Sequence, residues 1–471
     1  MISLKRIRLL ICFSLSLTLG QAHGDSQLPN LAANLDEQSL SNPSYILGQH
    51  WFRRLNGSKN LIIFPPAYNY LRNALSRLLP YTGLYQKHIE IGLLNSSKSN
   101  AFVLPGNHLF IYSDMLSKIK SEQTFFALLA HELAHLDLRH YERQNQQNQQ
   151  EQSKAMLMMG AGIAAALAGV QGDASYALLL SGIANKEENR LSYSRFQEQE
   201  ADRQAKRYLI NAGLNEHATS DLFLSFFQSS IGQEPIEFLS THPIPETRLA
   251  DSLDTSPPIS ILKQGDQTSF NQFRATMLAY RASFLANPNS YLNSQLSKKR
   301  DQDYAKALVA YLTNNKENAL EIAQTLDTSD NTHAYLKAKI LLMNQDSQEA
   351  SRLINKKLNI NQEQLSFIEL SNQIQPINKV PLAQPSLLQF EKDIINRIHL
   401  KQATETKNLA LTWAYKAKIA FNKGQAKAAL TLLNRAIPLA EGKDKIKVSE
   451  IENEIKERLA LEKSQGITQD Y

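Results

Sequence analysis

The chain has 471 residues, of which 42% are hydrophobic and 20% are charged. This is the composition of a globular protein with room for two or three hydrophobic cores, and it excludes disorder over the whole chain. The net charge of +6 falls to +3 when the three basic residues of the leader described below are removed, so nothing indicates nucleic-acid binding.

Residues 1–24 have the pattern of a secretory signal peptide, in which basic residues precede an apolar run from Leu9 to Leu19. The run is too short to span a bilayer comfortably. The only cysteine, Cys12, lies inside it, so we expect neither a disulfide nor an anchor after cleavage; an acylated lipoprotein is the less favoured alternative. A mature chain without cysteine suits an oxidising compartment, and we expect the periplasm.

Two helices and a small sheet are predicted after the leader. Apolar residues recur at helical spacing in 38–55 and 66–79, and strand-like stretches follow at 88–94 and 101–112. A Pro-Gly pair in the middle of the last stretch predicts a hairpin.

The strongest chemical signal is the His-Glu-x-x-His motif at 131–135. Ser121 is the expected N-cap, and the apolar residues that follow it predict a mostly buried helix. Because residues four apart share a helix face, His131 and His135 can present two imidazoles to one metal, while Glu132 reaches a water molecule bound there and takes its proton. The alternative, two surface histidines on an ordinary helix, is disfavoured by the apolar context.

A third metal ligand has to come from elsewhere in the chain. His140 is close in sequence, but nine residues at 100° each place it on the far side of a continuous helix from His131. A later helix offers Glu198 and Asp202 on one face, one to bind the metal and one to hydrogen-bond a ligand histidine from behind, whereas Glu200 points elsewhere. An exposed acidic helix is the alternative.

Between these two helices lies a segment with two apolar arms, from Met156 to Val170 and onward to Ala184. Neither arm reaches the ~20 apolar residues that a membrane span needs. We therefore expect a buried helical hairpin, with a loop that contacts a membrane as the alternative. For the same reason, an integral membrane protease is disfavoured.

The chain after a linker at 254–267 is expected to consist of helical repeats. Small and apolar positions recur 31 residues apart: Ala307, Tyr311 and Ala319 are followed by Ala338, Leu342 and Ala350. Tyr311 and Ala319 are eight residues apart, and the same interval separates Phe421 from Ala429. Helix pairs of ~34 residues with small residues at their crossings are typical of tetratricopeptide repeats. Residues 357–402, with three prolines, do not fit the pattern.

Several short motifs occur in an order that resembles the HtpX-type metallopeptidases. They are Asn100-Ala101-Phe102, Pro105-Gly106, His131 to His135, Ser194-Arg195-x-x-Glu198-x-x-Ala201-Asp202, and Thr241-His242-Pro243 with Arg248. The periplasmic, BepA-like members with a tetratricopeptide tail are the most similar. Asn107 stands where this family often has a second glycine, but asparagine tolerates a left-handed backbone, so we expect the turn to be kept.

The resemblance implies a role for each matching residue. It implies that His131, His135 and Glu198 bind zinc, that Glu132 is the general base and that Asp202 supports a ligand histidine. It also implies that an edge strand holds extended substrate, main chain to main chain; its residues are Ala101, Phe102, Val103 and Leu104.

Two further residues have open roles. His242, on a loop fixed by Pro243, is hypothesised to swing to the zinc as a fourth ligand and keep the site latent. The equally weighted alternative is a histidine that merely packs or binds substrate. Arg248 either contacts a carboxylate near the site or a substrate carbonyl.

These patterns predict an α+β, mainly helical fold. We expect a signal peptide at 1–24, a zincin-like metalloprotease domain at 25–255, a linker and connecting helix at 256–299, and tetratricopeptide-like repeats at 300–471.

The resemblance implies a periplasmic zinc endopeptidase, with one Zn²⁺ per chain, that acts on misfolded or stalled outer-membrane β-barrel proteins. Expected partners are these substrates, the β-barrel assembly machinery at the repeats, and peripherally the membrane. The alternative is a non-proteolytic chaperone or assembly factor with a structural or regulatory zinc site, and Glu132 distinguishes the two because it is not a ligand.

Overall fold

The computed structural model describes residues 40, 42–145, 195–230, 236–244, 248, 250, 252, 267–360, 365–375 and 387–467. The predicted signal peptide, the two apolar arms at 156–184 and all but the last residue of the predicted linker lie outside these residues.

Two helices begin the described chain, α1 (Pro43–Asn56) and α2 (Pro65–Leu78). Each has a proline in its first turn, where the missing N–H group removes no helical hydrogen bond. The Asn42 side chain caps α1 by accepting a hydrogen bond from the Ser44 N–H. Both helices were predicted from their apolar spacing.

A three-stranded sheet follows, with the spatial order β1-β3-β2. Its strands are β1 (Glu90–Leu94), β2 (Ala101–Leu104) and β3 (His108–Tyr112); β1 runs parallel and β2 antiparallel to β3. β1 is two residues shorter than predicted. The predicted hairpin joins β2 to β3, and Asn107 adopts the left-handed backbone at its turn (φ 63°), so the prediction that the turn is kept is confirmed. Within the described chain β2 is an edge strand.

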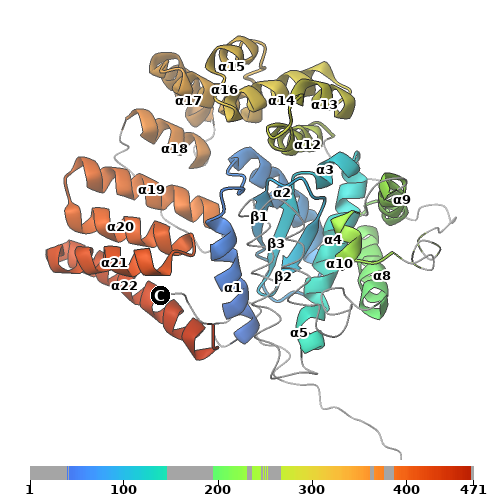
Figure 1. The fold of residues 1–471 in the computed structure, drawn as a ribbon, viewed down its shortest axis with the longest axis horizontal. Helices are drawn as coiled ribbons and strands as arrows, with labels where there is room; N and C mark the ends of the chain where they lie inside the picture. The colour runs from blue at the N-terminus through green and yellow to red at the C-terminus, as the bar shows by residue number, and fades with distance from the viewer. Residues whose placement is uncertain are drawn as a thin grey trace, which may run out of the picture. The chain divides into compact units, whose positions relative to one another are not determined.

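The long helix α4 (Glu122–Asp137) is buried along nearly its whole length. Figure 1 shows it between the sheet and helix α8 (Arg195–Asn211). The Ser121 hydroxyl accepts a hydrogen bond from the Thr124 N–H at 3.1 Å, as predicted for the N-cap. α4 contacts β2 on one side and two later helices on the other, α8 and α9 (Ala218–Ser230). A helix that is apolar all round needs such partners on every face.

Shorter helices complete this part of the molecule. They are α3 (Met115–Lys118), α5 (His140–Asn145) and α10 (Glu237–Thr241), with a 3-10 turn η2 at Leu79–Tyr81. Helix α5 follows α4 after a break of two residues, so the helix that carries the His-Glu-x-x-His motif does not continue to His140.

The rest of the described chain is helical (Figure 1), which confirms the predicted α+β, mainly helical class. The helices are α12 (Gln267–Ala282), α13 (Pro288–Gln295), α14 (Lys299–Leu312), α15 (Lys316–Ala323), α16 (Asn331–Met343), α17 (Ser347–Ile360), α18 (Leu365–Ile374), α19 (Gln389–Glu405), α20 (Leu409–Asn422), α21 (Ala426–Ala436), η3 (Ile437–Leu439) and α22 (Gly442–Ser464).

Alanines lie buried in the successive helices α14 to α17, where the 31-residue recurrence placed them; they are Ala307, Ala319, Ala338 and Ala350. The tetratricopeptide character of these helices stays a prediction. No helix in the described ranges is long and apolar enough to cross a bilayer.

One hydrophobic core runs from Ile62 to Ile398, so helices α12 to α19 share it with the sheet and α4. The Tyr68 and Phe390 rings lie 4.2 Å apart although 322 residues separate them in the chain. A second core holds α20, α21 and α22 together.

Helix α1 meets the C-terminal helices through a close polar contact. Glu462 of α22 pairs with Arg53 and lies 3.1 Å from the His50 ring; all three side chains are buried. A Cβ atom at Gly57, the C-cap of α1, would lie 2.2 Å from the Lys423 carbonyl oxygen, so only glycine allows the two chains to approach so closely.

Candidate metal centre and active site

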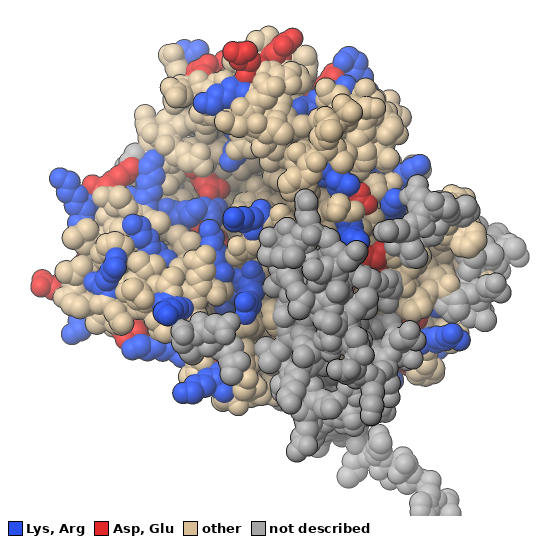
Figure 2. All heavy atoms as spheres, viewed as in Figure 1, with Lys and Arg blue, Asp and Glu red and all other residues tan. Residues whose placement is uncertain are grey.

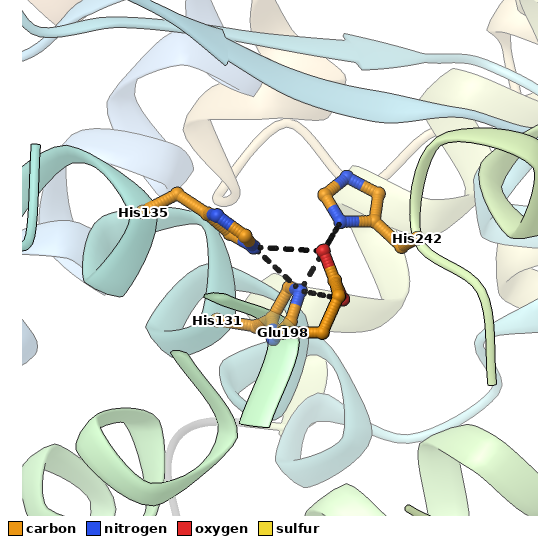
Figure 3. Close-up of side chains that lie close together, drawn as sticks. All are labelled: His131, His135, Glu198 and His242. Atoms are coloured by element: carbon orange, nitrogen blue, oxygen red, sulfur yellow. Dashed lines mark hydrogen bonds and ion pairs between the residues drawn. The ribbon is translucent and has the colours of Figure 1, made fainter. Parts of the chain in front are cut away.

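The last two turns of α4 place His131 and His135 on one buried face (Figure 3). Their Nε2 atoms lie 3.1 Å apart. Two imidazole nitrogens this close cannot both point a lone pair or both point a proton at the other. A shared cation, or a proton on one ring, resolves the conflict.

Helix α8 crosses α4 and brings Glu198 to the same point. One Glu198 oxygen lies 3.5 Å from His131 Nε2, and the other lies 3.5 Å from His135 Nε2. The carboxylate is fully buried. The pKa of Glu198 lies well below its usual value, because the nearby His242, His131 and His135 outweigh the opposing effect of burial.

His242 completes the group from the residue after α10 (Figure 3). Its Nδ1 atom lies 3.0 Å from Glu198 Oε1 and 3.4 Å from His131 Nε2. The Phe238 ring stacks on the His242 ring at 4.4 Å, and the Phe238 N–H donates to the Ser99 carbonyl just before the edge strand. The position of His242 is therefore fixed by both stacking and main-chain contacts.

The four donor atoms fit a tetrahedral metal. One atom from each of His131, His135, Glu198 and His242 lies within 4.8 Å of the others. Ligand bonds of 2.0–2.1 Å in a tetrahedral site put neighbouring donors about 3.3 Å apart. Five of the contacts within the group span 3.0–3.5 Å and bracket this value, and the group as a whole extends to 4.8 Å.

Glu132 lies beside this group without being part of it. It is fully buried, and neither of its oxygens has a hydrogen-bond partner among the described residues. Its nearest basic atom is His242 Nε2, at 3.7 Å. Burial raises the pKa of Glu132 to about 6, although His242 and His131 oppose the rise. A buried carboxylate with free oxygens and a raised pKa is suited to accept a proton.

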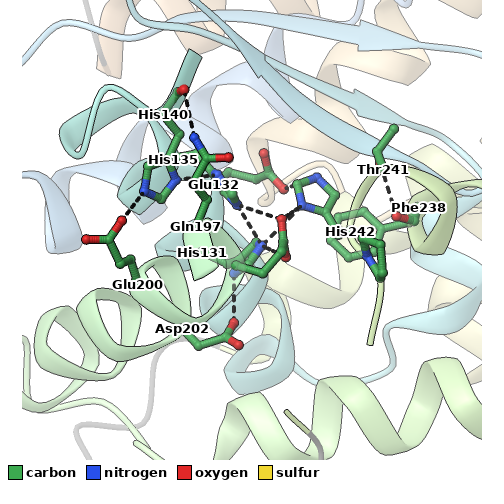
Figure 4. Close-up of polar contacts among 12 residues, drawn as sticks. His131, Glu132, His135, His140, Gln197, Glu200, Asp202, Phe238, Thr241 and His242 are labelled. Atoms are coloured by element: carbon green, nitrogen blue, oxygen red, sulfur yellow. Dashed lines mark hydrogen bonds and ion pairs between the residues drawn. The ribbon is translucent and has the colours of Figure 1, made fainter. Parts of the chain in front are cut away.

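Asp202 and Arg248 lie behind His131. Asp202 Oδ1 is 3.1 Å from His131 Nδ1, the side of the ring that faces away from the other donors (Figure 4). Burial lowers the pKa of His131, but its contacts with Asp202 and Glu198 outweigh this and raise it to about 10. The Arg248 guanidinium binds both Asp202 oxygens, at 2.7 and 2.9 Å, and reaches Glu198 Oε2 at 2.7 Å. Of the two alternatives for Arg248, the structure shows the contact with carboxylates.

His140 does not lie where a continuous α4 would place it. Helix α4 ends at Asp137, and Arg139 adopts a left-handed backbone (φ 50°), which turns the chain back toward the site. His140 Nδ1 consequently lies 2.9 Å from His135 Nδ1. His140 stays outside the donor group as predicted, but the predicted reason, a position on the far side of the helix, was wrong.

Glu200 points away from the donor group, as predicted, and toward His140. Its Oε2 atom lies 3.3 Å from His140 Nε2 (Figure 4). Neither residue was predicted to have a role at the site. The only signal in the sequence was a second histidine five residues after His135. Because α4 ends at Asp137, helical geometry could not predict where this histidine lies.

The buried His and Glu group, beside a carboxylate suited to take a proton, has the arrangement that a metalloprotease site requires. Residues 66–255 match the model of peptidase family M48, and this match supports a metalloprotease. The resemblance stated from the motifs is confirmed.

Relatives with assigned names agree with this class. The chain is 26% identical over 333 residues to the Beta-barrel assembly-enhancing protease of Escherichia coli (strain K12), which covers 68% of each chain. It is 24% identical over 321 residues to the Putative beta-barrel assembly-enhancing protease of Vibrio cholerae, 66% of each chain. It is also 26% identical over 210 residues to the Mitochondrial metalloendopeptidase OMA1 of Schizosaccharomyces pombe, 44% of this chain and 58% of that protein.

Proposed function

We propose that this chain is a zinc endopeptidase of the periplasm that degrades misfolded or stalled outer-membrane β-barrel proteins. The observation that carries the proposal is the set of converging donors around Glu198, beside a buried Glu132 with no hydrogen-bond partner among the described residues. The names of the bacterial relatives, which refer to β-barrel assembly, support the substrate class.

In this proposal His131, His135 and Glu198 hold the zinc. Imidazole nitrogens and a carboxylate are ligands that zinc prefers in hydrolases. When bound, zinc supplies a Lewis acid that polarises a peptide carbonyl and lowers the pKa of water. The charge balance supports a divalent ion, because the buried carboxylates of Glu132 and Glu198 and the partly buried carboxylate of Asp202 face one guanidinium, that of Arg248.

The chain's own residues supply the remaining steps. Glu132 takes the proton from the attacking water on a carboxylate oxygen and passes it to the leaving amine. Asp202 accepts a hydrogen bond from His131 Nδ1–H and thereby keeps Nε2 directed at the metal. Arg248 holds Asp202 and Glu198 in place.

The edge strand β2 is proposed to hold substrate. It pairs with β3 on one side only within the described chain, and residues 101–104 can add an extended peptide to the sheet. Unfolded β-barrel proteins supply such extended segments. β2 also contacts α4, so a peptide paired with β2 would run close to the site.

The C-terminal helices are proposed to contact the β-barrel assembly machinery or the substrate. Lys and Arg outnumber Asp and Glu within residues 387–467, and Figure 2 shows many of these basic side chains over the C-terminal helices. A partner surface with complementary negative charge is therefore favoured.

His242 is proposed to keep the site latent. His242 could hold a zinc ion as a fourth ligand, and a site with four protein ligands would leave no position for the water that a catalytic zinc activates. The same observation favours the second candidate function, a chaperone or assembly factor in which the closed zinc site is structural or regulatory.

The deciding experiment is degradation of an unfolded outer-membrane β-barrel protein by the zinc-loaded chain, compared with Glu132→Gln and His242→Ala. Cleavage that Glu132→Gln abolishes, with zinc still bound, supports the protease. Cleavage that rises in His242→Ala supports latency. If zinc binds and none of the chains cleaves, the chaperone reading replaces the endopeptidase.

A further inference from the structure

His140 is buried against the side of His135 that faces away from the donor group. The two Nδ1 atoms are 2.9 Å apart, and the rings meet edge to face at 74°. His140 is fully buried, so its ring contacts protein rather than water. This contact exists because the chain reverses at Arg139 instead of continuing α4.

Two residues of helix α8, one before and one after Glu198 in the chain, hold His140 in this position. The Gln197 side chain donates to the His140 carbonyl oxygen at 3.0 Å. The Glu200 carboxylate lies 3.3 Å from His140 Nε2 and is itself paired with Arg143 at 3.1 Å. The same turn of α8 that presents Glu198 to the donor group thus anchors His140.

The protons can be assigned from the contacts. His135 Nε2 faces Glu198 and His131, so it must offer its lone pair to a metal, and the proton then resides on Nδ1. That N–H points at His140 Nδ1, which must accept. The remaining proton of His140 is on Nε2, facing the Glu200 carboxylate. These assignments are compatible with one another along the series.

We infer that His140 is a positioning residue for His135, and that Glu200 holds His140 in the tautomer that can accept. The inference rests on the proposed metal site. His135 would then be oriented through an intervening imidazole, whereas Asp202 orients His131 directly. Such supporting hydrogen bonds fix the ring and make the ligand nitrogen more basic.

The test compares two substitutions at one position by their zinc affinity, measured by competition with a chromophoric chelator on the full chain. His140→Phe keeps a ring but removes the acceptor, so we expect the zinc dissociation constant to rise roughly 10- to 100-fold. His140→Asn places an amide oxygen close to where Nδ1 lies, and we expect it to stay within roughly threefold of the parent chain. The visible spectrum of the Co²⁺ form should change in the Phe variant and not in the Asn variant.

His333→Phe is the matched control. His333 lies in α16, far from the site in the sequence, and is also a buried histidine that stacks on an aromatic ring, that of Tyr304. It should leave the zinc affinity unchanged. Equal affinity of His140→Phe and the parent chain would overturn the inference. An equal loss in the Phe and Asn variants would also overturn it, because the acceptor atom would then be irrelevant.

Glu200 gives a second test should His140→Phe fail to fold. Glu200→Leu removes the last acceptor and should weaken zinc binding, whereas Glu200→Gln keeps an acceptor oxygen and should retain it. Equal affinity of both Glu200 variants and the parent chain would contradict the inference. A parent chain that binds no zinc would instead refute the proposed metal site itself.

Discussion

Two buried clusters of charged and imidazole side chains lie in this molecule, and they differ in their charge balance. Around Glu198, three carboxylates face one guanidinium, and the imidazoles converge on a single point. Between α1 and α22, one carboxylate, Glu462, faces one guanidinium, Arg53, with a single imidazole beside them. Apart from Asp202, whose side chain is 18% exposed, the named residues of both clusters are buried.

The difference separates a site that needs a cation from one that does not. When the imidazoles are neutral, as they must be to bind a metal, the first cluster lacks two positive charges, the charge of one zinc ion. The second cluster is neutral as it stands. Burying charge is costly unless it is paired, so the first cluster gains from a metal, whereas the second serves to join α1 to the C-terminal helices.

The largest expected effect comes from removing one carboxylate of the first cluster. Glu198→Gln should weaken zinc binding by more than the roughly 10- to 100-fold that loss of a supporting residue costs, and proteolysis should disappear. Zinc content after dialysis, with chelator competition, measures the effect. Glu462→Gln is the control and should keep its zinc; a Glu198→Gln chain that retained stoichiometric zinc would contradict the comparison.

The second cluster should respond in stability rather than in metal binding. Glu462→Gln leaves Arg53 buried without its anion, so the free energy of unfolding should fall by about 3–5 kcal/mol. Urea denaturation at saturating zinc measures it. Glu457→Gln, an exposed position on the same helix, should change stability by less than about 0.5 kcal/mol.

The double variant Arg53→Met with Glu462→Leu should recover much of this loss, because no charge is then left unpaired. If the double variant were less stable than Glu462→Gln, the cluster would hold the two helices by more than charge balance.

A smaller effect is expected at the residue behind His131. Asp202→Asn removes one negative charge next to the site and weakens the hold on the imidazole, so the zinc dissociation constant should rise roughly 10- to 100-fold. Arg203→Ala, exposed on the same helix, should have no effect. Isothermal titration or chelator competition measures the zinc affinity of both variants. Equal affinities of Asp202→Asn and Arg203→Ala would show that Asp202 does not support the site.

The smallest effect concerns a buried imidazole outside both clusters. His108 donates from Nδ1 to the Pro105 carbonyl and accepts at Nε2 from Gln49, so it is neutral. Burial lowers its pKa to about 4. Below pH 6.5 the unfolded chain binds a proton here that the folded chain does not, so stability falls as the pH falls.

Between pH 7 and pH 5 this group should lower the free energy of unfolding by about 2 kcal/mol. His108→Asn keeps a donor for Pro105 but does not titrate, so its stability should decline less over the same range. The measurement is the urea midpoint at both pH values. Identical declines in the two chains would show that His108 becomes protonated in the folded state.

Local patterns predicted the elements around the site well. The spacing of His131 and His135 is a property of one helix, and Ser121 marks its start, so neither depends on the rest of the fold. The end of that helix was not predictable, because Arg139 takes a left-handed backbone that usually belongs to glycine or asparagine. This single turn decides where His140 lies.

Contacts between distant segments were also beyond the sequence patterns. Nothing near Asp202 indicates that Arg248 binds both of its oxygens, and the sequence analysis left the role of Arg248 open. The pairing of Arg53 with Glu462 joins residues more than four hundred positions apart. Periodicity shows which face of a helix is buried, but not what buries it.

The hydrophobic core that runs from Ile62 to Ile398 joins the part that carries the site to helices α12 to α19, so we expect these parts to fold together. A gene shortened before α12 would encode a chain in which Tyr70 and Phe125 lose the aromatic rings of Phe270 and Phe273. Replacing the helical tail by that of another protein would therefore also require changes on α2 and α4, at the residues that contact α12.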